Sequence, residues 1–533
     1  MSEPAPHTYD FIIVGAGSAG AALAYRLSAD PTNRVLVLEA GPVDNFWSSI
    51  PMGYSRLVNN PAANWCYTAE PEASTDGRRL PVPRGRMLGG SSAINGLVFV
   101  RGQSHDYNTW AQMGNRGWSY EDVLPVFKRM ESYSGGSDEF RGRNGPLKVT
   151  DSDGSDPLFR ALVAAAQEAG VPRTGDYNGA SQEGISMSQA TIANGKRVST
   201  AQSYLNPVKY RPNLEIITDA LTSRLVLDGK RCGGVQFNHD GETRTAYARA
   251  EVVLSAGSIN SPALLELSGI GQPDRLQSLG IDVQHALSGV GENLRDHYAP
   301  RTRWRIDAPR MPFNHRGKGW GLAREISRYL LTGTGMIGMP AAPIRAFVRS
   351  REGLMAPDVL LGWVPLLYES GMIVSEVPGV TCYAHPMRPE STGTVHITSW
   401  DPRSAPAIRF NFLSTPPDAE VAVRAIRIAR SIMTSPTMQA LGTSELAPGD
   451  ARQLDDEILE WIKAAGETTY HPVGTCKMGQ DDRAVVDEQL RVRGLKGLRV
   501  ADASIMPTLI SGNTNAPSIM IGEKASDLIL GRD

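Results

Sequence analysis

Three glycines near the start of the chain have the spacing that brings a backbone close to phosphate. Gly15, Gly17 and Gly20 follow a short apolar run and precede a segment rich in alanine. A glycine turn before a helix lets amides approach a pyrophosphate, and the positive end of the helix dipole favours its charge. Glu39 ends the next apolar run, about 20 residues on, where a carboxylate accepts hydrogen bonds from a ribose. The pattern predicts a dinucleotide site without distinguishing NAD from FAD.

A second stretch, residues 85–96, is dense in glycine and serine. Residues this small let a backbone come very close to a flat or phosphorylated ligand. The apolar residues 98–100 follow at once, so the stretch leads into buried structure. We therefore expect it to contact a bound ligand and not to form a free surface loop.

The elements that must position these loops predict a mixed α/β fold. Apolar runs predict strands, and apolar residues at helical spacing predict amphipathic helices. A strand that runs into small residues, as at 254–258 and 500–504, is typical of the ligand edge of a nucleotide-binding sheet. The expected strands cover residues 11–14, 34–38, 213–217, 224–227, 234–237, 251–254 and 497–500. The expected helices are 119–131, 156–169, one starting at Ser261 and one from Asn515 to Leu530.

Residues 298–448 have a different composition. Glycine loops disappear, tryptophan and methionine become frequent, and residues 394–397 and 407–412 alternate as half-buried strands. We expect a second unit, built on an antiparallel sheet. The predicted division is a Rossmann-like nucleotide-binding domain and a discontinuous substrate-binding domain. The first comprises residues 1–155, 190–298 and 452–533, and the second comprises residues 156–189 and 299–451.

Composition narrows the partners and the location. The 533 residues include 54 basic and 56 acidic ones, so the charge gives no reason to expect nucleic acid as a partner. The four cysteines are scattered without metal or disulfide spacing, which favours reduced thiols in the cytoplasm. No signal peptide and no apolar run of transmembrane length is seen. We expect a cytoplasmic protein, and peripheral contact with a membrane stays open.

Together the motifs resemble those of the glucose–methanol–choline (GMC) oxidoreductases, flavoenzymes that oxidise alcohols. The likeness covers nearly the whole chain in the family's order, and is greatest to bacterial choline-dehydrogenase-like alcohol dehydrogenases and oxidases. The matching segments are residues 85–108, 257–271, 471–479, 500–507 and 513–517.

The resemblance implies FAD, bound non-covalently, because Ala93 stands where some members carry a flavin-linked histidine. It implies that Glu39 meets the adenosine ribose, that the backbone of Thr222 meets adenine, and that Asn515 either lies by the flavin or caps a helix. The full set of implied cofactor-binding residues is Gly15, Gly17, Ser18, Ala19, Gly20, Glu39, Ala40, Trp65, Gly89, Gly90, Ser91, Asn95, Gly96, Leu97, Val98, Thr222, Ala256, Asp502, Ala503, Thr514 and Asn515.

His471 matches the family's active-site base, and Asn513 matches its second catalytic position. Alcohol oxidation needs a base that titrates near neutrality and a hydrogen-bond donor for the developing alkoxide. The resemblance thus implies that a primary alcohol becomes an aldehyde, with its proton passing to His471 and a hydride to flavin N5. A Cys476–His471 nucleophile is rejected because hydride transfer needs none. We interpret three other histidines, His297, His385 and His396, as ordinary core or surface residues.

Three questions stay open. The electron acceptor is oxygen or a quinone-type molecule, depending on the space and charge near the flavin C4a edge, where we expect residues 96–98. The alternative function is that of a hydroxynitrile lyase, which uses the same fold with a structural flavin. A flavin-binding protein without turnover is disfavoured by the His471–Asn513 pair. Choline would favour an aromatic cage or a carboxylate, which Trp363, Tyr368 and Glu369 could supply, but other alcohols fit as well.

Overall fold

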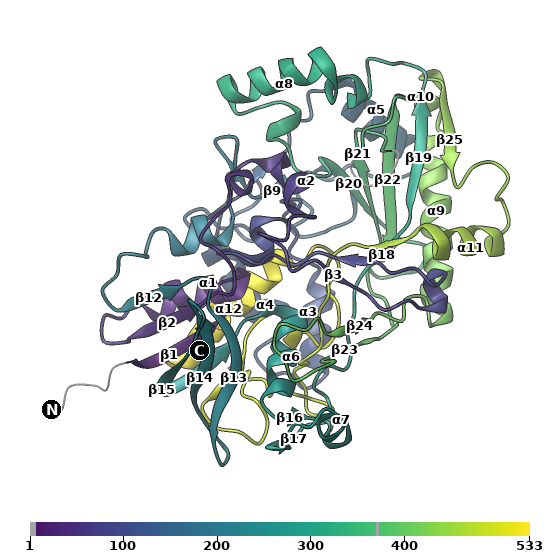
Figure 1. Ribbon diagram of the computed structural model, residues 1–533. Helices are drawn as coiled ribbons and strands as arrows, with labels where there is room; N and C mark the ends of the chain where they lie inside the picture. Colours follow the sequence, from purple (N-terminus) through teal and green to yellow (C-terminus); the bar gives the residue numbers. More distant parts are fainter. Residues whose placement is uncertain (1–6, 369–372, 533) are drawn as a thin grey trace.

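The first apolar run forms the centre of a seven-stranded sheet in the computed structural model, which describes residues 7–368 and 373–532 (Figure 1). Strand β1 lies between β2 and β15, and all three are parallel. The sheet continues through β12 on one side and through antiparallel β14 and β13 on the other, while β27 pairs with β15. The strands are β1 (Thr8–Val14), β2 (Val35–Leu38), β12 (Leu214–Ile217), β13 (Leu221–Asp228), β14 (Arg231–His239), β15 (Glu242–Leu254) and β27 (Leu498–Val500).

The two ends of the chain meet on one side of this sheet. Helix α1 (Ser18–Leu27) packs against the closing helix α12 (Asn515–Leu530), purple against yellow in Figure 1. Gly522 allows the close approach, because a Cβ there would come within 2.3 Å of the Ala19 carbonyl oxygen. Arg26 also binds Asp527 at 2.6 Å across the contact. The predicted return of the chain to its first sheet is therefore confirmed.

The second sheet has six strands and is antiparallel throughout, in the order β25-β19-β22-β21-β20-β8. Helices α5 and α9 pack beside it. The strands expected at 394–397 and 407–412 exist, but β23 (Thr394–His396) and β24 (Ala407–Arg409) pair with each other outside this sheet. The six strands are β8 (Gly184–Met187), β19 (Arg301–Ile306), β20 (Ile344–Val348), β21 (Val359–Val364), β22 (Gly379–Pro386) and β25 (Thr443–Ala447).

The helices follow the expected pattern with one shift. Helix α6 (Gly257–Leu267) begins a turn earlier than expected, because the Asp502 carboxylate accepts from the Gly257 amide at 2.8 Å and satisfies the helix start. None of the helices in the described part of the chain is both long and apolar enough to cross a membrane. The other main helices are α3 (Ser104–Gln112), α4 (Tyr120–Met130), α5 (Pro157–Glu168), α8 (Gly319–Thr332), α9 (Pro416–Met433) and α11 (Asp455–Ala465).

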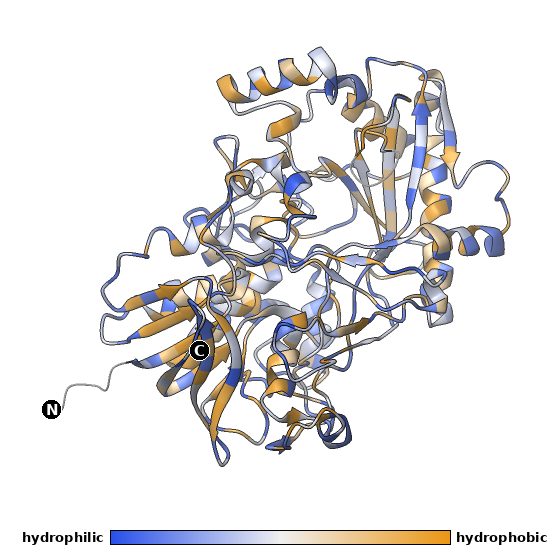
Figure 2. Ribbon diagram, in the orientation of Figure 1, coloured by the Kyte–Doolittle hydropathy of each residue, from blue (hydrophilic) through white to orange (hydrophobic). Residues whose placement is uncertain are grey.

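Figure 2 shows where the apolar residues lie in this arrangement. The arrows of the first sheet are largely orange, and every residue of β2 is buried. Strand β20 is likewise buried along its whole length. Each sheet therefore has its own hydrophobic core.

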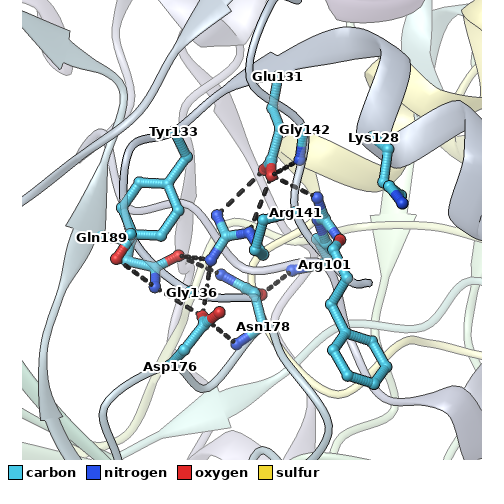
Figure 3. Close-up of polar contacts among 12 residues, drawn as sticks. Arg101, Lys128, Glu131, Tyr133, Gly136, Arg141, Gly142, Asp176, Asn178 and Gln189 are labelled. Atoms are coloured by element: carbon cyan, nitrogen blue, oxygen red, sulfur yellow. Dashed lines mark hydrogen bonds and ion pairs between the residues drawn. The ribbon is translucent and has the colours of Figure 1, made fainter. Parts of the chain in front are cut away.

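A buried ion-pair network fixes the segment that follows the glycine-rich stretch (Figure 3). Glu131 is fully buried and accepts from Arg101 at 2.6 Å and from Arg141 at 2.8 Å. Arg141 continues to Asp176 at 2.6 Å and to Gln189 at 2.9 Å. Arg101 directly follows the apolar residues 98–100, so the network anchors the end of that loop to the body of the protein.

Candidate active site

A cavity of about 610 Å³ lies between the two sheets. Its walls include Val14 and Leu38, at the ends of β1 and β2, and Leu360 and Tyr383 of β21 and β22. The carboxyl ends of parallel strands are the usual ligand edge of such a sheet. The cavity therefore combines a nucleotide-binding edge with the face of a second, antiparallel sheet.

The glycines meet across one end of this cavity. Gly17 caps α1 without any side-chain hydrogen bond, so the first amides of the helix are available to an anion. Gly15 has a φ of +97°, and a Cβ there would meet the Ser255 carbonyl oxygen at 2.5 Å. A Cβ on Gly90 would come within 2.8 Å of the Gly17 Cα. The two loops fit a pyrophosphate held by backbone alone.

Glu39 and Thr222 line the same part of the cavity. The Glu39 carboxyl accepts from the Ala16 and Gly41 amides, both at 3.0 Å, and burial raises its pKa to about 7. Oγ1 of Thr222 is buried and has no partner among the described residues. The Thr222 hydroxyl lacks a partner, and hydroxyl donors would stabilise the buried Glu39 carboxyl. Both features fit a bound adenosine, with its ribose and base.

Most of the sequence-predicted cofactor residues line the cavity, with Gly20 and Gly89 as exceptions. A Cβ on Gly20 would lie 1.9 Å from the Gly15 carbonyl oxygen, so this glycine serves the packing of α1. Gly89 instead faces the backbone of Ala201. Asn515 is the first residue of α12, and its Oδ1 accepts from Ser18 Oγ at 2.7 Å, so it joins the two chain ends and does not cap the helix.

His471 and Asn513 face each other across the far end of the cavity. Nδ2 of Asn513 lies 2.9 Å from Nε2 of His471. On the other side of the amide, Arg345 of β20 donates from Nη1 to Oδ1 at 3.0 Å. Because a guanidinium only donates, the amide oxygen faces Arg345 and the NH₂ group faces His471. Nε2 of His471 is therefore the acceptor, with the lone pair that a base requires.

His297 fixes the other nitrogen of His471. Nε2 of His297 is 2.8 Å from the Met387 carbonyl oxygen, which only accepts, so in the neutral ring its Nδ1 is unprotonated. That Nδ1 lies 3.1 Å from Nδ1 of His471, which must then be the donor. Thr469 Oγ1, at 2.8 Å, offers the same nitrogen a second acceptor. The interpretation of His297 as an ordinary core residue misses this contact, since it is buried but orients the neighbouring ring.

The field around His471 is positive. Burial lowers its pKa well below the usual value, and His385, Arg84 and Arg345 lower it further. His385 also lines the cavity, and burial lowers its pKa to about 4. His471 is therefore neutral at pH 7, and the site favours negative charge on a bound oxygen. His396 fits its expected role, because it is buried on Glu266 at 2.7 Å.

Several cavity residues escaped the sequence reasoning. They come from separate strands and loops, so no spacing in the sequence marks them. Of the residues suggested for a choline cage, Trp363 belongs to the hydrophobic core and does not line the cavity, Tyr368 does line it, and Glu369 falls outside the described residues. Other lining residues that the sequence did not indicate include Tyr54, Arg84, Arg301, Tyr383, Glu467 and Tyr470.

Comparison with known proteins gives a consistent family. Sequence models described as GMC oxidoreductase match residues 9–299 and 389–522. The chain is 42% identical over 528 residues to an oxygen-dependent choline dehydrogenase of Vibrio vulnificus, covering 98% of this chain and 94% of that one. The protein of the same name from Brucella anthropi is 42% identical over 527 residues, with 98% and 96% covered.

Solved structures agree in fold and cofactor class. A pyridoxine 4-oxidase from Mesorbium loti has 30% identity and a TM-score of 0.87, covering 97% of this chain and 98% of that one. A variant formate oxidase of Aspergillus oryzae has 26% identity and a TM-score of 0.91, with 98% of each chain covered. An FAD-dependent oxidoreductase of Chaetomium thermophilum reaches 0.90 at 27% identity, covering 98% of this chain and 99% of that one. The chain therefore belongs to the GMC oxidoreductases, as an FAD-dependent enzyme that acts on CH–OH groups.

Proposed function

We propose that the protein oxidises a primary alcohol to an aldehyde, with His471 as the base and Asn513 as the donor to the alcohol oxygen. The carrying observation is the directed chain of hydrogen bonds from Arg345 through Asn513 and His471 to His297. When FAD is bound, its flavin N5 supplies the hydride acceptor. The lone pair of His471 Nε2 accepts from Asn513 here, and it takes the hydroxyl proton when the alcohol oxygen binds between the two side chains.

Each residue around the alcohol oxygen has a separate role in the proposed reaction. The alcohol oxygen binds where it can donate to Nε2 of His471 and accept from Nδ2 of Asn513. As the proton leaves, the positive surroundings of Arg84 and Arg345 stabilise the developing alkoxide. The contact from Nδ1 of His471 to His297 keeps the imidazole in its orientation during the transfer. We further propose that the seven-stranded unit holds FAD and the six-stranded unit holds the substrate.

The first experiment is an anaerobic screen of alcohols against the FAD-loaded enzyme. We expect bleaching of the flavin absorption by at least one alcohol. The relatives' names make choline the first alcohol to test, although the cavity charges described below favour another class. A hydroxynitrile lyase would leave the flavin oxidised, so absence of bleaching by every alcohol, with cleavage of a cyanohydrin, would reverse the proposal. Repeating the reaction in air with peroxide detection separates oxygen from a quinone-type acceptor.

Arg345 should act through Asn513 and through its charge. We expect Arg345→Met to lower kcat about 10- to 100-fold, because the amide loses the donor that fixes its orientation. Losing a positive neighbour also raises the pKa of His471, so the base becomes protonated at higher pH. The acid limb of the kcat/KM profile should therefore move to higher pH.

Arg345→Lys is the matched control, since it keeps the charge but not the planar guanidinium contacts. Its acid limb should stay near that of the wild type while kcat falls. Flavin content measured on each variant shows whether the site is still assembled. An unchanged acid limb in Arg345→Met would contradict the assigned role.

We also propose a cytoplasmic location with peripheral contact with a membrane through α8. Trp320, Leu330 and Leu331 of this helix are 90%, 76% and 85% exposed. Arg324 and Arg328 are exposed on the same helix. An exposed helix that combines large apolar side chains with arginine is typical of binding to an anionic lipid surface.

Vesicles with and without anionic lipid test this surface by co-sedimentation. The wild type should bind the anionic vesicles, and Trp320→Ser with Leu331→Ser should weaken binding about tenfold or more. Met355→Ser changes an exposed apolar residue outside the helix and serves as the control. Equal sedimentation of the double variant and the wild type would reject α8 as the contact.

A further inference from the structure

An ion pair lies in the cavity wall away from the catalytic chain. Arg301 begins β19, and Glu467 belongs to β26 (Glu467–Thr468). Nη2 of Arg301 is 2.7 Å from Oε2 of Glu467, and the two side chains are 39% and 41% exposed. Both line the cavity, so a molecule inside it can reach them. Nothing in the proposed proton transfer uses this pair.

The guanidinium has donors left for a ligand. Glu467 contacts it at Nη2 and the Tyr470 side chain hydrogen-bonds it as well, whereas a guanidinium carries five N–H donors in a planar fork. Burial raises the pKa of Tyr54, Tyr368 and Tyr470, and the charge of Arg301 opposes that rise in all three. Arg301 is therefore close to three tyrosines that line the same space.

The charge balance of this half of the cavity is positive. Among the described lining residues from the second sheet and β26, Glu467 is the only acid, and Arg301 already pairs with it. Asp401 also lines the cavity, and it is paired with Arg403. Arg84 adds a second cation, and Arg345 lies behind Asn513. A quaternary ammonium needs a free carboxylate or an aromatic cage without a competing cation. Arg301 pairs with Glu467 and lies near the aromatic rings.

We propose that Arg301 anchors the substrate, and that the alcohol carries a carboxylate at the end remote from the reacting hydroxyl. This inference rests on the proposed function, and it names the substrate class of the same site. Arginine binds carboxylates through two parallel hydrogen bonds, which suits the free edge of the guanidinium. Glu467 holds Arg301 in place and cancels only part of the positive charge around it.

A binding measurement tests the anchor without turnover. Butyrate and tetramethylammonium are titrated into the FAD-loaded enzyme by calorimetry. We expect butyrate to bind more tightly, Arg301→Gln to weaken butyrate about tenfold, and Glu467→Gln to strengthen it. Arg305→Gln, on the same strand but paired with Asp307 at the surface, is the matched control. Unchanged butyrate affinity in Arg301→Gln, or tighter binding of tetramethylammonium by the wild type, would overturn the inference.

A turnover series tests the substrate class. The series comprises γ-hydroxybutyrate, choline and neohexanol, which is choline with carbon in place of nitrogen. The wild type should prefer γ-hydroxybutyrate. Arg301→Gln should lower the kcat/KM for γ-hydroxybutyrate about tenfold relative to that for neohexanol. A merely structural role of Arg301 would lower the kcat/KM for all three alcohols alike. Choline as the best wild-type substrate, or an equal loss for all three alcohols, would refute the anchor. If no alcohol bleached the flavin but butyrate binding still depended on Arg301, the proposed function would be wrong and the anchor would stand.

Discussion

Replacing His471 by alanine is expected to lower the rate of flavin reduction by alcohols by a factor on the order of a thousand while FAD stays bound. The imidazole offers the lone pair to which the hydroxyl proton passes, and Asn513 can donate but cannot take its place. The proposed cofactor contacts lie mainly on the cavity loops around Gly15, Gly90 and Glu39, which the substitution leaves intact. Rapid-mixing absorbance under anaerobic conditions measures the rate, and the flavin spectrum measures occupancy.

His105→Ala is the control, because this histidine is exposed on α3 and away from the cavity. Alcohols should reduce the flavin of this variant at the wild-type rate. If the alanine variant of His471 instead reduced its flavin nearly as fast as the wild type, His471 would be removed from the mechanism. If the alanine variant of His471 lost FAD together with activity, the role of His471 would be structural.

Glu131→Ala should destabilise the protein by about 3–5 kcal/mol, the largest effect we expect outside the active site. The substitution leaves the guanidinium groups of Arg101 and Arg141 buried without their shared carboxylate (Figure 3). The Gly142 amide, which donates to Glu131 at 2.9 Å, also loses its acceptor. Urea denaturation of the FAD-loaded enzyme, followed by circular dichroism and flavin fluorescence, measures the loss.

A surface pair gives the comparison for this effect. Glu420 and Arg424 lie one turn apart on α9 and are partly exposed, so Glu420→Ala should change stability by less than about 0.5 kcal/mol. Because Arg101 follows the loop that lines the cavity, Glu131→Ala should also release flavin at lower urea than global unfolding requires. If flavin release and unfolding of Glu131→Ala both had their midpoints at the urea concentration of the wild type, the ion-pair network would contribute nothing to stability.

The nucleotide-binding half of the fold could be predicted because its determinants are local. Strand, glycine turn, helix and acid follow one another within residues 8–39, and the sequence shows each of them directly. The match of β27 to the first sheet could also be anticipated, since its apolar run ends in the same small residues as β15. His471 and Asn513 could be named from the family motifs, and the structure places them in contact.

The antiparallel sheet of the second unit was expected, but its individual strands and the cavity charges could not be predicted in the same way. Strands β20, β21 and β22 are largely buried on both faces, so they lack the alternation that identified residues 394–397 and 407–412. Arg301 and Glu467 come together only because β26 returns beside β18 (Tyr298–Ala299), a pairing across a long stretch of chain. Likewise, the contact between His297 and His471 depends on tertiary packing that no local pattern encodes.

The pairing of α1 with α12 has a consequence for how the enzyme is made in the cell. The ribosome produces the glycine loop before α1 long before it produces α12, the helix that packs against α1. We therefore expect a nascent chain to take up FAD only after α12 has been synthesised. A message truncated before α12 would yield a colourless, protease-sensitive polypeptide, because the apolar face of α1 would be left uncovered.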